Sequence, residues 1–342
     1  MRIEKILFVL MIIGTSLLQV SAQDLHYTQF YAAPLQYNPA NTGNFNGSYR
    51  VGAILRSQWA SVTVPYQTVS AYSDFALVQD EYANNWIGLG LHVSMDRAGD
   101  GILQTFNASG NVAFHKDLSA GIYISLGGSF GYTQKSIDFS KLRFNSQWNE
   151  TYFDIELPSN ESYDYETRGN LDVAAGVALT FELSEDLILN VGSALLHVNE
   201  PIESFYFTDN LHGNNRRNTR LVSYLNAEYH LNDYFYLQPG VFFGSERKAR
   251  ELMLGSNAVF VLQTGTAYQK GSQVWAGLWY RNKDAIAPVL GYAWGTTRAL
   301  FSYDINISNL NIASNYRGGG ELSIQHIGGF RQKEGRLHCP RF

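Results

Sequence analysis

The stretch RALFSYDINIS, residues 298–308, alternates between apolar and polar side chains. The alternation is strict from residue 301. Positions 301, 303, 305 and 307 are Phe, Tyr, Ile and Ile, whereas positions 302, 304, 306 and 308 are Ser, Asp, Asn and Ser. A period of two residues indicates a β-strand with two different faces. Because about 9–11 tilted residues cross a bilayer, the stretch predicts a membrane strand with one face toward lipid and the other toward a wet interior.

The same alternation recurs at residues 121–133, 171–183 and 187–198. Adding weaker stretches, we expect about fourteen antiparallel strands, an even number. Their expected ranges are 49–58, 66–77, 86–96, 102–115, 119–135, 168–182, 187–198, 220–230, 234–245, 254–269, 273–281, 285–294, 298–308 and 319–330. The prediction is therefore an all-β fold, a transmembrane outer-membrane β-barrel.

The connections between the expected strands are unequal. From the fourth strand on, every second connection is predicted to be tight, at residues 116–118, 184–186, 231–233, 270–272 and 295–297. The alternate connections include two long ones, 136–167 and 199–219. Outer-membrane barrels have short periplasmic turns and longer extracellular loops. With an even strand count, this pattern predicts that both termini lie in the periplasm.

The composition agrees with a membrane barrel. Charged residues make up 16% of the chain and aromatic residues 14%, whereas soluble domains carry about 25% charged residues. Tyr and Trp are enriched where a protein meets lipid headgroups. A soluble β-sandwich would alternate similarly, but its outer face would be more charged. Beyond the first 22 residues no long apolar run predicts a membrane helix, and a closed barrel is the other structure that pairs every backbone group in lipid.

Residues 1–22 have the features of a secretory signal peptide. Arg2 and Lys5 precede the apolar residues 6–18, and Val20-Ser21-Ala22 is a small-residue cleavage site. The predicted location is the outer membrane of a Gram-negative bacterium. The only cysteine is Cys339, so no intrachain disulfide is expected.

No pattern in the chain predicts catalysis, a cofactor or a metal site. The eight histidines show no metal-ligand spacing. No glycine-rich stretch lies between a strand and a helix, as a phosphate loop would. The net charge of −5 argues against nucleic acid as a partner. We therefore expect a protein that is not an enzyme.

The stretch NPANTG, residues 38–43, interrupts the strand pattern near the start of the expected mature chain. Asn38 suits the N-cap of a helical turn, Pro39 its first position and Gly43 the left-handed residue that ends it. Asn38, Pro39, Ala40 and Gly43 are therefore the candidate residues of a hatch at the periplasmic mouth, held by an inner wall that includes Arg56 and Asp304. The alternative is a simple lead-in turn before the first strand.

Five charged or polar residues are predicted to face the lumen. They are Arg50, Arg56, Gln58, Asp74 and Asp304. A hairpin through residues 59–65 would bring Arg50 close to Asp74. Such residues either form ion pairs that stabilise a buried polar interior or line a lumen that holds the hatch or passes a polar chain.

The long loops combine aromatic side chains with charges, a mixture used by protein-binding hot spots. The candidate partner-binding residues are Trp148, Tyr152, Phe153, Tyr163, Tyr165, Phe205, Tyr206 and Phe207. The alternative is a solvated loop whose rings pack on each other over the barrel.

Several blocks together resemble the PorP/SprF family of type IX secretion and gliding barrels. They are QDLHYTQFYAAPLQYNPANTG (23–43), ILRSQWASV (54–62), SAYSDFAL (70–77), GLWYRNKDA (277–285), FSYDINIS (301–308) and the terminal CPRF (339–342). One departure is Leu55, where the family more often has an aromatic residue. The NPANTG turn also resembles the N-terminal hatch of fatty-acid-transporter-like barrels, which have fourteen strands.

The resemblance implies a non-enzymatic role in export and surface attachment of large adhesins. The implied partners are outer-membrane lipids, a secreted adhesin with a type IX C-terminal sorting domain, and a periplasmic ring lipoprotein or a peptidoglycan-binding protein of the machinery. The alternative is a passive channel or a transporter of small hydrophobic molecules. The expected organisation is a signal peptide (1–22), a hatch segment (23–48), a barrel (49–330) and a periplasmic tail (331–342) that includes Cys339 and Phe342.

Overall fold

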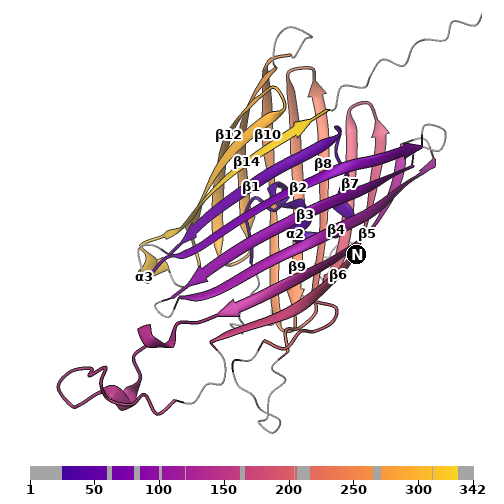
Figure 1. The fold of residues 1–342 in the computed structure, drawn as a ribbon. Coiled ribbons are helices and arrows are strands. Elements are labelled where there is room, and N and C mark those ends of the chain that lie inside the picture. The colour runs from indigo at the N-terminus through magenta and orange to yellow at the C-terminus, as the bar shows by residue number, and fades with distance from the viewer. Residues whose placement is uncertain are drawn as a thin grey trace, which may run out of the picture.

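The chain forms a closed antiparallel barrel of fourteen strands in the computed structural model (Figure 1). Residues 25–59, 64–80, 85–99, 102–119, 121–161, 166–203, 205, 216–264, 271–309 and 311–329 are described. The expected signal peptide, the tail with Cys339 and Phe342, and the candidate loop residues Tyr163, Tyr165, Tyr206 and Phe207 lie outside the described residues.

Each strand pairs with its neighbours in the chain, and β1 also pairs with β14, which closes the barrel. The strands are β1 (Tyr49–Gln58), β2 (Tyr66–Asp80), β3 (Asn85–Ala98), β4 (Leu103–Ser119), β5 (Ile122–Ser136), β6 (Thr167–Ser184), β7 (Leu187–Leu196), β8 (Arg220–Asn232), β9 (Phe235–Glu246), β10 (Ala249–Gln263), β11 (Ser272–Arg281), β12 (Ala285–Trp294), β13 (Thr297–Asn306) and β14 (Arg317–Gly328). The all-β prediction and the count of fourteen are confirmed.

Several expected boundaries differ from the observed ones; the tenth strand, for example, ends at Gln263 rather than at residue 269. Residues 116–118 are not a turn, because Lys116 and Asp117 still pair with β5 and the chain reverses beside Gly121, whose φ is +85°. The tenth strand starts at Ala249 rather than at residue 254. The turn before it is formed by Arg247, with φ +53°, and Lys248. Neither residue is a usual turn former, so the sequence carried no signal for this turn.

The long connections, 137–166 and 197–219, lie at one end of the barrel together with the two-residue turn 247–248. Short turns beside Gly121 and at 185–186, 233–234 and 295–296 lie at the other end. We call these the loop end and the turn end. Because β1 starts and β14 finishes at the turn end, the barrel is entered and left on the side of the short turns. In Figure 1 the connection after β5 projects well beyond the strands.

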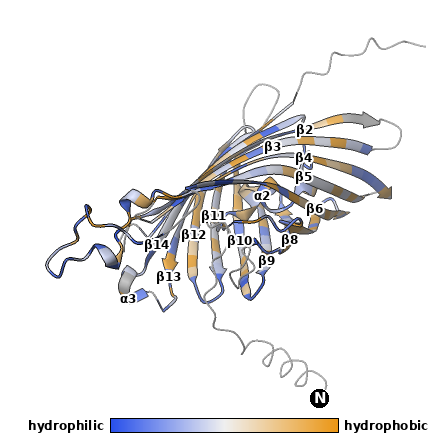
Figure 2. Ribbon diagram, turned by 60° about the horizontal axis from the view of Figure 1, so that its bottom comes forward, coloured by the Kyte–Doolittle hydropathy of each residue, from blue (hydrophilic) through white to orange (hydrophobic). Residues whose placement is uncertain are grey.

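The two faces of the wall differ as the alternation predicts. On β13, Phe301, Tyr303 and Ile305 are exposed on the outside, whereas Ser302 and Asp304 are buried inside. On β1, Arg50 and Arg56 face inward and Leu55 faces outward. Figure 2 shows apolar and polar bands alternating along the strands.

The helical elements are short. They are η1 (Phe30–Ala32), α2 (Pro34–Tyr37) and η2 (Pro39–Asn41) before β1, η3 (Phe139–Lys141) and η4 (Asn145–Gln147) in the first long loop, and α3 (Asn311–Ser314) before β14. In the part of the chain that the structure describes, no helix has the length and apolar character needed to cross a membrane.

An arginine on the outer face should be costly. Phe301 is the fifth residue of β13 and is 50% exposed. Phe301→Arg should destabilise the barrel by about 2–4 kcal/mol, the cost of a cation at the bilayer midplane. The control is Ile155→Arg, because Ile155 is 76% exposed in the 137–166 loop. Urea unfolding in lipid vesicles measures both, and equal midpoints would mean that β13 does not face lipid at Phe301.

Candidate functional site

The candidate site is the interior of the barrel, which residues 25–48 occupy. We call these residues the N-terminal segment; it contains η1, α2 and η2 and is drawn in indigo inside the barrel in Figure 1. Most of its side chains from Tyr27 to Thr42 are buried. Its first residues contact strand positions near the loop end, and its last residues lead into β1 at the turn end. The segment therefore runs along the lumen.

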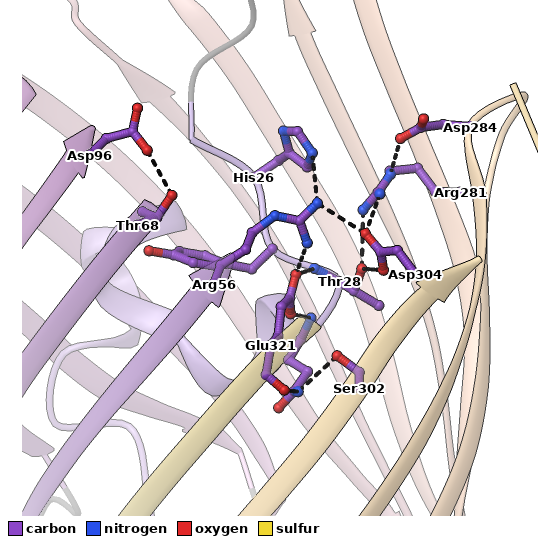
Figure 3. A network of polar contacts seen from close by, with 12 residues as sticks. His26, Thr28, Arg56, Thr68, Asp96, Arg281, Asp284, Ser302, Asp304 and Glu321 are labelled. Atoms are coloured by element: carbon purple, nitrogen blue, oxygen red, sulfur yellow. Dashed lines mark hydrogen bonds and ion pairs between the residues drawn. The ribbon is translucent and has the colours of Figure 1, made fainter. Parts of the chain in front are cut away.

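A charged network holds the first residues of the segment (Figure 3). Arg56 forms ion pairs with Glu321 and with Asp304, where Nη2 lies 2.9 Å from Oδ2. Arg281 reaches the same Asp304 oxygen at 2.6 Å. The carboxylates in turn accept from the segment: Glu321 from the backbone N–H of Thr28 at 2.7 Å, and Asp304 from the Thr28 hydroxyl at 2.7 Å. Wall charges on β1, β11, β13 and β14 thus converge on Thr28.

Gln29 and Leu25 extend this attachment. The Gln29 amide donates to Ser302 Oγ at 2.9 Å and accepts from Ser323 Oγ at 2.6 Å. Arg220, which is paired with Glu251 at 3.3 Å, donates to the carbonyl of Leu25 at 3.2 Å. Buried polar groups are costly unless paired, so these contacts fix the segment and the wall to each other.

Aromatic packing joins the middle of the segment to the wall. The Phe30 ring lies 5.2 Å from that of Phe242 and 5.4 Å from that of Trp279. Tyr37 meets Phe242 at 5.0 Å. These centroid distances are typical of favourable aromatic pairs. The barrel therefore has an aromatic core inside its lumen, formed partly by the segment.

The NPANTG turn adopts the expected local structure. Asn38 caps η2 by accepting from the backbone N–H of Ala40 at 2.9 Å, Pro39 is the first residue of η2, and Gly43 has a φ of +73°. The Asn38 amide also donates to the carbonyl of Val177 on β6 at 3.0 Å. One side chain therefore caps the turn and attaches it to the wall.

Three wall glycines make room for this turn. A Cβ on Gly88 would lie 1.9 Å from the carbonyl oxygen of Thr42, one on Gly127 would lie 2.3 Å from the nitrogen of Ala40, and one on Gly176 would lie 2.0 Å from Asn38 Oδ1. Such distances are far inside van der Waals contact. β3, β5 and β6 thus approach the turn more closely than any other residue type would allow.

The ion pair expected between Arg50 and Asp74 is present, with Nη2 and Oδ2 2.7 Å apart. Asp74 also accepts from the backbone N–H of Gly43 at 2.7 Å, and Arg50 donates to the carbonyl of Asn41 at 3.0 Å. On β4, His115 contacts the carbonyl of Thr42 at 2.7 Å. Arg50 and Asp74 therefore neutralise each other's charge and also hold the end of the NPANTG turn.

The expectation that Arg56 and Asp304 hold the NPANTG turn is wrong. They contact residues 26–29 near the loop end, whereas the turn is held by Arg50, Asp74, His115 and the glycines nearer the turn end. The reason is that α2 and η1, which were not predicted, carry the segment along the lumen before it reaches Asn38. Gln58, the fifth predicted lumen residue, also faces inward and is buried.

Comparison with known proteins places this barrel in a family. The family model described as type IX secretion system membrane protein PorP/SprF matches residues 19–325. The chain belongs to the PorP/SprF family. Because the family is one of membrane proteins and membrane proteins with closed antiparallel barrels are of the outer-membrane type, this PorP/SprF chain is an outer-membrane β-barrel. A search of curated proteins found no match.

Solved structures with the same fold include two toluene transporters. TbuX of Ralstonia pickettii has a TM-score of 0.52 and 11% identity, over 88% of this chain and 94% of that chain. TodX of P. putida has a TM-score of 0.51 and 9% identity, over 86% of this chain and 93% of that chain. At such identities the likeness shows the shared barrel fold alone.

The long loops of this PorP/SprF barrel present exposed rings. Trp148 and Phe153 pair across a β-bridge with ring centroids 5.1 Å apart, and both are exposed, as is Tyr152 at 59%. The Phe205 ring of the second loop packs edge-on against the Phe139 ring of the first, with the ring centroids 6.3 Å apart. Lys135 and Arg217 both pair with Glu203. The two loops are thus joined to each other, with an aromatic surface facing outward.

The sequence reasoning missed several residues that hold the segment. Thr28, Gln29, Arg220, Arg281 and Glu321 were not among the candidates. The signal for Glu321 was the alternation of GELSIQH, where its position shares a face with Ser323 and Gln325. Among the described residues no cluster of His, Cys, Asp and Glu could hold a metal ion.

Proposed function

We propose that this PorP/SprF protein is a plugged, non-enzymatic barrel that assists export and surface attachment of a large adhesin with a type IX C-terminal sorting domain. The observation that carries the proposal is the family match over residues 19–325. In this proposal residues 23–48 are the plug, residues 49–330 the barrel and residues 331–342 a periplasmic tail. The sequence up to residue 22 is the signal peptide.

The contacts of the N-terminal segment support the plug. It is bound near the loop end through Thr28, in the middle through Phe30 and near the turn end through Asn38. A segment fixed at three levels is suited to remain in place while other proteins bind outside. The proposed role is thus that of a membrane-embedded scaffold rather than a conduit.

The orientation in the proposal puts the loop end at the cell surface and both termini in the periplasm. Short periplasmic turns and long outer loops are the rule for such barrels. The exposed rings of Trp148, Tyr152 and Phe153 then face outward for the adhesin, since aromatic residues supply most hot spots of protein interfaces. The turn end faces the periplasmic partner, a ring lipoprotein or a peptidoglycan-binding protein.

The second candidate is a channel or a transporter of small hydrophobic molecules. The fold shared with toluene transporters favours it. It requires a path through or beside the N-terminal segment, and the contacts of that segment oppose such a path.

Photocrosslinking in native envelopes tests the proposed partners. A crosslinking amino acid at Tyr152 should capture the adhesin, and one at Asp233, in the turn between β8 and β9, should capture the periplasmic partner. The matched control is a crosslinker at Leu290, which faces lipid on β12. Capture of the same proteins from all three positions, or of none from Tyr152 and Asp233, would contradict the proposal.

Cysteine labelling tests the orientation. In a Cys339→Ser background, Ile155→Cys should react with a membrane-impermeant maleimide in whole cells. Asp233→Cys should react only after the outer membrane is permeabilised, because its turn is proposed to face the periplasm. The reverse pattern of labelling would show that the barrel is inserted the other way.

A further inference from the structure

A cavity of about 230 Å³ lies in the lumen near the turn end. Arg298 and Ile188 line it, and each is only the second residue of a strand that starts at the turn end. Tyr31 of the N-terminal segment and Trp279 of β11 line its deep part, with ring centroids 5.4 Å apart. The cavity therefore lies between the aromatic core around Phe30 and the opening of the barrel at the turn end.

Arg298 differs from the other arginines inside the barrel. Arg50, Arg56, Arg220 and Arg281 each form an ion pair with a carboxylate. Within the described part of the chain Arg298 forms none. Its buried Nε has no hydrogen-bond partner, and its guanidinium lies 5.0 Å from the centre of the Trp275 ring. The indole N–H of Trp275, a buried residue, is also unpaired among the described residues.

The other polar groups of the cavity limit what Arg298 binds. Glu228 lines the same space, with one oxygen 2.8 Å from the Gln238 amide and the other 2.9 Å from His230. A carboxylate here disfavours a doubly charged anion such as phosphate. The Asn226 amide also lines this space and can donate hydrogen bonds, whereas the Asn190 amide already donates to Thr180 Oγ1 at 3.0 Å. The planar guanidinium fork matches a carboxylate in a bidentate manner.

We infer that this cavity is a binding site for a monocarboxylate carried next to an aromatic or apolar group. The carboxylate pairs with Arg298, and the apolar group lies against Tyr31 and Trp279. The ligand is either a small aromatic acid or the carboxyl terminus of a peptide, since the two present the same chemistry. The inference does not depend on the proposed adhesin, because it rests on the cavity alone.

Calorimetric titration of the purified full-length barrel tests the inference. The probes are N-acetyl-phenylalanine and the peptide acetyl-Gly-Gly-Phe, each compared with its C-terminal amide, and inorganic phosphate. At least one of the two acids should bind, whereas both amides and phosphate should bind roughly tenfold or more weakly. Binding of N-acetyl-phenylalanine alone identifies a small-molecule site, and tighter binding of acetyl-Gly-Gly-Phe identifies a site for a peptide carboxyl terminus.

Variants separate Arg298 from general charge effects. Arg298→Gln should weaken binding of the acid roughly tenfold or more, and Arg298→Lys should restore only part of it, because lysine lacks the fork. The control is Arg250→Gln, since Arg250 is exposed on β10. Heat-resistant gel mobility verifies that each variant is folded. Equal binding of acids and amides by the wild type, or no loss in a folded Arg298→Gln variant, would overturn the inference.

Discussion

Gly127→Val should displace the NPANTG turn from its contact with β5, whereas Gly128→Val should leave the turn in place. A Cβ at Gly127 would lie 2.3 Å from the nitrogen of Ala40 and 2.4 Å from the carbonyl carbon of Pro39, and a Cβ at Gly128 meets nothing within 4 Å. Overpacking costs about 1–3 kcal/mol where side chains can adjust. At Gly127 the opposing atoms are backbone, so the turn itself has to move.

Hydrogen–deuterium exchange measures this displacement. In Gly127→Val, the backbone amides of residues 40–43 should exchange much faster than in the wild type, while the strands keep their protection because they pair independently of the segment. Gly128→Val should match the wild type, since this neighbour on β5 points to the opposite face of the wall. Unchanged protection of residues 40–43 in Gly127→Val would show that the turn is not seated against β5.

Removing the Asp304 carboxylate should detach the other end of the segment. Asp304 is buried and accepts from Arg56, Arg281 and the Thr28 hydroxyl. Asp304→Ala would leave two guanidinium groups in the lumen with one acceptor fewer, and breaking a buried ion pair on one side costs about 3–5 kcal/mol. We expect lower stability in urea and faster exchange of residues 26–30.

Asp284→Ala is the matched control for Asp304→Ala. Asp284 also pairs with Arg281, at 2.6 Å, but its side chain is 39% exposed. Ion pairs at exposed positions contribute about 0–1 kcal/mol, so this variant should unfold within about 1 kcal/mol of the wild type. If the two aspartate variants lost equal stability, the buried network would not be what anchors the segment.

The barrel wall was predictable from the sequence because its signal is local and repeated. Alternation identified the lipid and lumen faces of β1 and β13 correctly, since one face of every strand meets lipid and the other does not. The Arg50–Asp74 pair also followed, because a hairpin fixes which residues of β1 and β2 lie opposite each other. The errors occurred at turns such as Arg247-Lys248, whose residues lack the usual turn chemistry.

The interior was predictable only in part. The cap chemistry of Asn38, Pro39 and Gly43 is local and was recognised. The partners of the turn were not, because Gly88, Gly127 and Gly176 come together only when β3, β5 and β6 curve around the segment. Nor does any local rule place Thr28 beside Asp304, which is 276 residues away in the chain. Polar residues in alternating strands indicate that a lumen is wet but not what fills it.

Single-channel conductance in planar lipid bilayers tests most directly whether the N-terminal segment closes the barrel. The comparison is between the purified wild-type protein and a variant that lacks residues 25–45, both checked for heat-resistant barrel mobility on gels. The wild type should show little or no steady conductance, and the deletion should show stable open channels. Equal conductance of the two proteins would contradict the plug, and with it the proposal that this barrel is a scaffold rather than a conduit.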